Sequence, residues 1–308
     1  MEENIRYYKK IDAVNPVMIA AWPGMGNVAL GTVDYIRRKL KAVRFAEIKT
    51  DPLAALDAVE VKSGLSKIPK TPLSTFYYVK SPEMILFEGE VQPSGRSGIE
   101  LLNKVISVAV DQKVSRIFTG AAFPMPISYK DASEIYGAAN KEVLRDYLKE
   151  SGIRLMDRGH ISGLNGLMLG FAAKKGIDAI CLLATMPHYA ISLPNPKASS
   201  VIIETLNKML KISIDARELD VYIKEMEERM AIVEDKVKDV ITIEEESIKL
   251  HPHHEKKIPG FIVKRIEKLF VEAKEDRNKA SSLKNELDRW DLYGLYEDRF
   301  LDLFKENQ

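Results

Sequence analysis

The hydrophobic residues between about residue 16 and residue 212 form short runs, separated by longer stretches with helical periodicity. The short runs are rich in Val, Ile, Leu and Ala, which is typical of strands that are buried on both faces. We expect strands at Val17–Ala21 and at residues 43–48, 84–88, 115–120, 153–156 and 178–184. We expect helices at residues 27–40, 98–111, 133–150, 166–175 and 198–210. This alternation predicts an α/β fold with a mainly parallel, twisted sheet and helices on both of its faces.

Residues 58–80 follow a different pattern, with alternation of apolar and polar side chains. Val59 and Val61 alternate with polar residues, and Phe76 and Tyr78 repeat the period further on. A period of two is typical of half-buried strands. We therefore expect either an antiparallel hairpin or an addition to the edge of the sheet.

The character of the chain changes after Ile214, because glycine nearly disappears and Glu, Lys and Arg dominate a helical pattern. We therefore divide the chain into an α/β domain, residues 1–214, and a helical extension, residues 215–308. Asp215 and Glu218 form a plausible capping pair at the start of the extension. Two further helices, residues 260–274 and 282–304, are expected to form a small bundle. Their aromatic stripe, Trp290, Tyr293, Tyr296, Phe300 and Phe304, favours a core or a subunit contact over a ligand cage.

A heptad seam runs along the first helix of the extension. Its apolar residues recur at alternating steps of four and three: Leu219, Ile223, Met226, Met230, Val233, Val237 and Val240. This spacing is typical of a coiled coil and places the seven side chains on one narrow stripe, which another helix must cover. The covering helix comes either from this chain or from a second subunit, and the pattern leaves both open.

Composition narrows the classes of function. The chain has 308 residues, with 46 Lys and Arg against 45 Asp and Glu, so no overall basic field recruits nucleic acid. No apolar run approaches the length that spans a membrane, and residues 1–10 lack the apolar region of a signal peptide. We expect a cytoplasmic protein without a membrane partner. The single cysteine, Cys181, lies in an apolar run and is expected to be a buried structural thiol.

Two glycine turns are the best candidates for a small-molecule crevice. The first, Trp22 to Asn27, follows a predicted strand, and the second, Ser162 to Gly166, precedes a predicted helix. Glycine permits the sharp turn, and an asparagine that enters a helix can cap its free N–H groups. Backbone donors at such corners can face an open crevice. The candidate residues are Trp22, Gly24, Gly26, Asn27, Gly163, Asn165 and Gly166.

The first turn satisfies the dinucleotide pattern G-x-G-x-x-A, with Glu47 and Asp51 beyond the next strand. However, Pro23 directly before Gly24 removes a backbone donor and restricts its neighbour. The second turn is too short for a phosphate loop with its lysine. We therefore expect no nucleotide cofactor. The turns serve either a binding site of another kind or close packing of a helix on the sheet.

The chemistry near the crevice is sparse. Glu88 and Glu90 flank a glycine at the end of a predicted strand, so both carboxylates are candidates for the crevice, or alternatively for a helix cap or a pair with Arg96. His160 and His188 can reach the same region, but no nucleophile pattern accompanies them. We therefore name no catalytic residue. The cluster His251-Pro252-His253-His254 is interpreted as a polar loop rather than a metal site.

Four segments together resemble the proteasome-assembly-chaperone superfamily. They are residues 22–29 (WPGMGNVA), 87–93 (FEGEVQP), 163–167 (GLNGL) and 193–198 (LPNPKA). The resemblance covers about residues 14–215. It implies an α/β sandwich similar to nucleoside phosphorylases, C-terminal helices, homo-oligomers, and binding of proteasome subunits during assembly. Archaeal members that dock on the proteasome end in a hydrophobic residue, Tyr and one more residue. This sequence ends in residues 305–308 (KENQ), so we expect no docking through such a tail.

Two functional hypotheses follow. The first is a non-enzymatic, homo-oligomeric assembly or scaffold protein whose helical extension builds the oligomer or presents a partner surface. The second is an enzyme or sensor that binds a nucleoside-like or phosphorylated small molecule between the glycine turns. In the second case Asn27 and Asn165 position the ligand, and Glu88 or Glu90 bonds a sugar hydroxyl.

Overall fold

The computed structural model describes residues 5–48, 59–68, 70–250, 260–275, 279–290 and 292–303. Asp51, the cluster at residues 251–254, Phe304 and the last four residues lie outside the described residues. The chain divides into two compact units, Met1–Asp239 and Val240–Gln308. The division falls later than the expected boundary after residue 214, because the first part of the long helix α6 (Leu219–Leu250) packs against the first unit.

The first unit is built on a nine-stranded sheet with the order β1-β3-β6-β7-β2-β8-β11-β9-β10. The strands are β1 Ile5–Tyr7, β2 Val17–Ala21, β3 Val43–Ile48, β6 Ser74–Val79, β7 Met84–Gly89, β8 Arg116–Met125, β9 Ile135–Ala139, β10 Arg154–Leu155 and β11 Asp178–Pro187. The four central strands, β7, β2, β8 and β11, run parallel to one another. Antiparallel pairs join both flanks to this centre. The sheet is therefore mixed, and the expectation of a mainly parallel sheet holds only for its centre.

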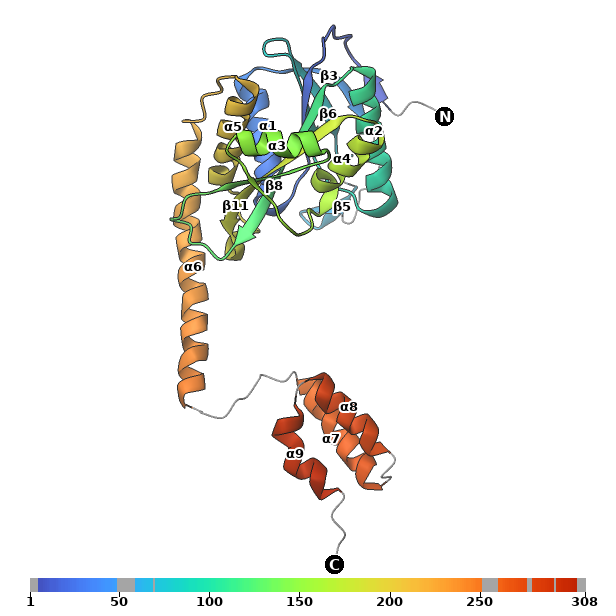
Figure 1. Cartoon of the computed structure of the whole chain (residues 1–308), viewed down its shortest axis with the longest axis vertical. Coiled ribbons are helices and arrows are strands. Elements are labelled where there is room, and N and C mark those ends of the chain that lie inside the picture. Colours follow the sequence, from blue (N-terminus) through green and yellow to red (C-terminus); the bar gives the residue numbers. More distant parts are fainter. Residues whose placement is uncertain are drawn as a thin grey trace, which may run out of the picture. The chain divides into compact units, whose positions relative to one another are not determined.

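Helices cover both faces of the sheet (Figure 1). Helices α1 (Val28–Lys39), α3 (Glu142–Glu150) and α5 (Pro196–Leu210) pack on one face, and α2 (Gly95–Asp111) and α4 (Gly163–Lys174) pack on the other. The central strand β2 serves both cores. Ile19 and Ala21 face α1 and α5, whereas Met18 and Ala20 face α2 and α4. This two-sided burial explains why β2 is an unbroken apolar run.

The expected helix at residues 133–150 is wrong in its first part. Residues Ile135–Ala139 form β9, which pairs antiparallel with β11, and only Glu142–Glu150 is helical. Gly137 in this strand has no room for a side chain, because a Cβ there would lie 2.9 Å from the methyl carbons of Leu148. Close packing of α3 on β9 thus overrides the local helical pattern. Strands β8 and β11 also continue past their expected ends, to Met125 and Pro187.

Residues 59–79 contain the antiparallel hairpin, one of the two alternatives, and a strand of the main sheet that is not the expected addition to its edge. Strands β4 (Glu60–Lys62) and β5 (Leu65–Lys67) form a separate two-stranded antiparallel hairpin. Strand β6 pairs antiparallel with β3 on one side and β7 on the other, so it lies inside the sheet rather than at its edge.

The second unit contains α7 (Gly260–Glu275), α8 (Ala280–Arg289) and α9 (Tyr293–Asp302). Ile266, Leu283 and Leu287 are fully buried at the centre of their common core. Within the aromatic stripe Phe300 is buried, and Tyr293 and Tyr296 pack against the same core, whereas Trp290 is 39% exposed. None of the described helices combines the length and the apolar character that crossing a membrane requires.

Candidate functional site

The first glycine turn is held by backbone hydrogen bonds to the segment before α5. The Gly26 N–H donates to the Ile191 carbonyl, and the Asn195 N–H donates to the Gly26 carbonyl, both at 2.8 Å. Gly26 adopts φ +61°, and a Cβ there would lie 3.0 Å from the sulfur of Met186. Asn195 also caps α5, since its Oδ1 accepts from the Ala198 N–H at 3.0 Å. The positive φ thus favours glycine at this position, and the Met186 side chain leaves little room for a Cβ.

Asn165 joins the two turns directly. Its Oδ1 accepts from the Trp22 N–H at 3.0 Å, and its Nδ2 donates to the Trp22 carbonyl at 3.1 Å. The Asn165 carbonyl in turn accepts from the Thr119 hydroxyl at 2.9 Å. Asn165 is only 5% exposed. The amide side chain therefore ties β2 to the first turn of α4 inside the core.

The segment after β7 completes this junction. The Trp22 ring lies so close to Gly89 that a Cβ there would come within 2.4 Å of the ring. The Gln92 Oε1 accepts from the Leu164 N–H at 2.9 Å. Of the four segments that carry the resemblance, the first therefore contacts each of the other three, and the second also contacts the third.

The capping role expected for the asparagines is wrong. Asn27 adopts a left-handed conformation with φ 47° and makes no side-chain hydrogen bond at the start of α1. Asn165 lies within the first turn of α4, which begins at Gly163 rather than after the glycine turn. Its side chain bonds to the backbone of Trp22 instead of to its own helix. Contacts between segments distant in sequence thus decide the role of both residues.

A cleft of 570 Å³ does lie between the two turns. Gly24 and Met25 line it from the first turn, and Gly163 and Asn165 line it from the second. Its polar side chains come from Gln92, Arg158, His160, Ser162 and Asn165. Arg158 and Gln92 were not among the predicted site residues. Arg158 lies two residues before His160 in the loop before α4, a position that no motif marks.

Glu88 and Glu90 do not line this cleft. The Glu88 carboxylate accepts from the Arg37 guanidinium of α1 at 2.7 Å, and the Glu90 carboxylate accepts from the Leu73 N–H at 2.9 Å. Burial raises the pKa of Glu88 above its ordinary value, although the Arg37 guanidinium acts in the opposite direction. Both carboxylates thus hold neighbouring segments, and the structure does not bring them together with the glycine turns.

The two described histidines also differ in position. His160 lines the cleft, whereas His188 is exposed and its Nδ1 lies 3.2 Å from the Met125 carbonyl oxygen. Among the residues that the structure describes, no three His, Cys, Asp or Glu side chains are grouped so that they can hold a metal ion.

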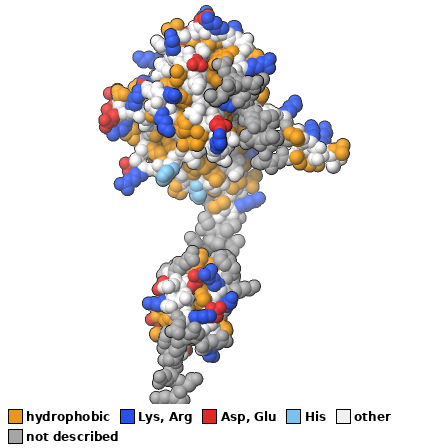
Figure 2. All heavy atoms as spheres, turned by 90° about the vertical axis from the view of Figure 1, so that its right-hand side faces the viewer, with side chains coloured by type: hydrophobic (Ala, Val, Ile, Leu, Met, Phe, Trp, Pro, Cys, Tyr) orange, Lys and Arg blue, Asp and Glu red, His pale blue; other side chains and the backbone are white. Residues whose placement is uncertain are grey.

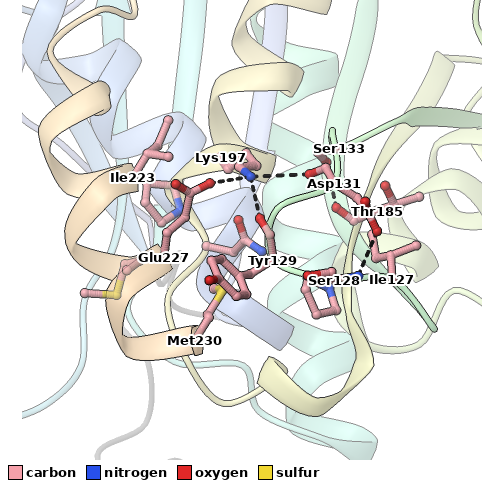
Figure 3. A pocket seen from close by; sticks show the side chains of 14 residues that line it. Ile127, Ser128, Tyr129, Asp131, Ser133, Thr185, Lys197, Ile223, Glu227 and Met230 are labelled. Carbon is pink, nitrogen blue, oxygen red and sulfur yellow. Dashed lines mark hydrogen bonds and ion pairs between the residues drawn. The ribbon is translucent and has the colours of Figure 1, made fainter. Parts of the chain in front are cut away.

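A second candidate surface is the contact between α6 and the first unit (Figure 3). Lys197, at the start of α5, donates to the Tyr129 carbonyl at 2.6 Å and forms an ion pair with Glu227 of α6. Two turns further along α6, the Glu234 carboxylate accepts from the Ser128 hydroxyl at 2.9 Å and from the Tyr189 hydroxyl. The remaining space between these side chains is only 10 Å³, room for about one water molecule.

The heptad seam on α6 therefore faces its own chain over the described residues. Leu219 and Met230 are 7% and 3% exposed, and Ile223 packs against the core beneath α1 and α5. Met226, Val233 and Val237 are half-buried. The side chain of Val240 lies outside the described residues. For the first part of the seam, the cover is the α/β unit itself rather than another helix of a bundle.

The family of the chain follows from the segment that contains both glycine turns and the first part of α6. The family model described as PAC2 matches residues 18–234. The chain belongs to the PAC2 family. The family segment ends at Glu234, the residue that holds α6 to the loop after β8, so α6 begins within the family's common region.

Three other proteins each match at least 70% of this chain. The uncharacterized protein MJ1210 of Methanocaldococcus jannaschii is 27% identical over 217 residues, which cover 70% of this chain and 81% of that protein. PbaB of Pyrococcus furiosus, described as an archaeal proteasome activator, is 26% identical with a TM-score of 0.64, covering 75% of this chain and 98% of PbaB. PbaA of the same organism, described as an archaeal homolog of proteasome-assembly chaperone, has a TM-score of 0.60 at 19% identity, covering 76% and 99%. Because the identity to PbaA is only 19%, this likeness shows the fold alone.

Proposed function

We propose that this PAC2-family chain is a non-enzymatic assembly factor that acts in the cytoplasm, as a homo-oligomer, through contacts with proteasome subunits. The observation that carries this proposal is the likeness to PbaB, an archaeal proteasome activator, over 98% of the PbaB chain at 26% identity. Membership of the PAC2 family supports the same role.

The geometry of the glycine turns supports a protein that works through its surface. A small anionic ligand at such a turn needs free backbone donors. The N–H groups of Trp22, Gly26 and Leu164 already donate within the chain. These parts of the motif therefore serve to assemble the fold.

The helical extension, residues 215–308, is proposed to build the oligomer or to present the partner surface. Leu219 and Met230 are already covered by the first unit. The later seam positions Val233 and Val237 are half-buried, and together with Val240 they form the part that we assign to a second subunit. The mixed sheet covered by helices supports the α/β class, and its closer likeness to nucleoside phosphorylases is part of the same proposal.

The proposed role is tested by a time course of proteasome assembly. Separately purified α and β subunits of the same organism are mixed with and without the full chain, and core particles are followed on native gels. We expect core particles to form faster with the chain. As a matched pair, Val233→Lys with Val237→Lys should remove the effect, whereas Glu228→Lys, an exposed position on the same helix, should retain it. Identical time courses with and without the chain would contradict the proposal.

A second candidate function is binding of a nucleoside-like or phosphorylated small molecule in the 570 Å³ cleft. The observation in its favour is that Arg158, His160 and Gln92 line this cleft. Such a ligand at one hundred times its Kd would stabilise the fold by about 2.7 kcal/mol. A thermal-shift screen against a metabolite panel should then find a ligand whose effect is abolished by Arg158→Ala with His160→Ala and kept by Lys175→Ala outside the cleft. A screen without any shift eliminates this candidate.

A further inference from the structure

The end of the sheet opposite the glycine turns carries four exposed lysines. Lys9 and Lys10 follow β1, Lys41 follows α1, and Lys80 follows β6. In the part of the chain that the structure describes, no carboxylate pairs with any of these four ammonium groups. Figure 2 shows Lys and Arg side chains in blue over the upper end of the first unit, with orange hydrophobic side chains between them.

These lysines surround a hollow of 410 Å³ with an apolar floor. We call it the basic hollow; it is lined by Lys9, Lys10, Ile11, Asp12, Leu40, Lys41, Val43, Phe45, Tyr78, Val79, Lys80 and Ser81. Val43 is 53% exposed, so part of the floor faces water. A neighbouring hollow of 540 Å³ shares the segment from Lys9 to Asp12 and adds Asp111 and Lys113, whose charges offset each other. Removing this apolar surface from water favours association.

The charge of the basic hollow is unbalanced although the chain as a whole is not. Four lysines and one aspartate line it, which gives a local excess of three positive charges, whereas the whole chain has a net charge of +1. Like charges that are gathered around one hollow repel one another and attract an acidic partner. The local excess is therefore a feature of this surface rather than of the composition.

We propose that the basic hollow binds an acidic segment of a partner protein that carries aliphatic side chains between its carboxylates. The aliphatic side chains occupy the apolar floor, and the carboxylates meet the four lysines. A single-stranded nucleic acid fits less well, because it needs free aromatic faces for stacking. The nearby Tyr8 ring is already covered by Arg6 and Arg44, at 4.7 and 4.6 Å from its centre.

The test uses the full chain and a fluorescein-labelled peptide in which Asp and Glu alternate with Leu and Val, measured by fluorescence anisotropy. We expect binding that weakens as salt is added. Replacing Asp and Glu by Asn and Gln, or Leu and Val by Ser, should abolish it. If single-stranded DNA of equal charge binds as tightly as the peptide through the same lysines, the proposal that the partner is a protein is wrong.

A matched pair of variants locates the site. The first carries Lys9→Gln, Lys10→Gln, Lys41→Asn and Lys80→Gln; asparagine is used at position 41 because its φ of 48° suits that residue. The control removes four other exposed lysines, at positions 62, 175, 208 and 274, also by substitution with Gln. Both variants should keep the melting temperature of the original chain. The first variant should bind the peptide on the order of tenfold more weakly, whereas the affinity of the control should stay within about twofold of the original. Equal losses of peptide affinity in both variants would show that the peptide does not bind at the basic hollow.

This inference rests on the proposed action through protein contacts, but the two can fail separately. If the chain accelerates proteasome assembly and the peptide does not bind, only the basic hollow is wrong. If the peptide binds at the four lysines and assembly is unaffected, the basic hollow stands and the proteasome is not its partner.

Discussion

Asn165 is the residue on which the junction of the two glycine turns depends. Its amide pairs with both the N–H and the carbonyl of Trp22, and all of these groups are buried. Buried backbone groups that lose their partner cannot turn to water, so their desolvation remains uncompensated. The main role of the Asn165 side chain is thus to link β2 to α4.

We expect Asn165→Ala to lower the free energy of unfolding by about 2–4 kcal/mol, because two backbone groups of Trp22 lose their partner. Urea unfolding followed by Trp22 fluorescence measures this in a Trp290→Phe background, in which Trp22 alone reports on the first unit. As a control, Asn27→Gly should change stability by less than about 0.5 kcal/mol, since Asn27 has a positive φ and makes no capping bond. A small effect of Asn165→Ala would show that the junction does not depend on this amide.

Cys181 should behave as a buried neutral thiol. Burial raises the pKa of its thiol from 9.0 to about 11. Since the folded pKa lies above the unfolded one, the stabilising contribution is complete below pH 9 and is lost as the pH rises toward 11. Between pH 8 and pH 10 the original chain should therefore lose about 1 kcal/mol more stability than Cys181→Ala. Parallel losses in urea titrations, or rapid reaction of the native thiol with a disulfide reagent at pH 8, would contradict the buried thiol.

At the scale of elements, the first part of α6 belongs to the α/β unit. Met230 is 3% exposed and lines the contact together with Ile127 and Tyr129, whereas Ile232 on the same helix is 59% exposed. Met230→Ala should therefore cost about 2–4 kcal/mol of stability, because it leaves a cavity in this contact. Ile232→Ala should cost less than about 0.5 kcal/mol. Equal effects of the two substitutions, measured by the same Trp22 signal, would mean that α6 does not pack here in solution.

Much of the element pattern is predictable from the sequence, because buried parallel strands and amphipathic helices carry strong local signals. Val17–Ala21 and Val43–Ile48 form strands with the expected bounds. Strand β9 was not predicted, because its local sequence does not favour a strand. What stabilises it is its pairing with β11 and the close approach of α3 to Gly137. Such contacts between distant segments leave no local period in the sequence.

The position of the candidate site could be predicted from the sequence, but the contacts within it could not. The glycine turns do meet, and a cleft lies between them. The sequence could not show that the Asn165 amide would hydrogen-bond to the Trp22 backbone, or that Glu88 would pair with Arg37. In both cases the partner lies at least 51 residues away in the sequence, so only the folded chain brings the groups together.

At the scale of the whole molecule, the position of the domain boundary is testable by truncation. A chain that ends at Asp239 keeps Leu219 and Met230 on the first unit, whereas a chain that ends at residue 214 exposes the core surface that they cover. We expect the first chain to retain the unfolding midpoint of the Trp22 signal and the second to be less stable by several kcal/mol, on the order of two lost core side chains. Equal midpoints would place the boundary at residue 214.

The two ends of the α/β unit differ in character. At one end the motif segments contact one another beside the cleft, and the opposite end presents lysines around an apolar floor. In this arrangement the motif residues secure the fold, and the surfaces of the unit and of the helical extension are the ones that we propose contact protein partners.

Native mass spectrometry of the full chain, alone and mixed with proteasome α subunits and core particles of the same organism, tests directly whether the chain forms an oligomer and binds proteasome subunits. We expect a homo-oligomer in the first sample and a further mass in the second that contains both the chain and proteasome subunits. A monomer in the first sample and no shared mass in the second would contradict an assembly factor that acts through protein contacts.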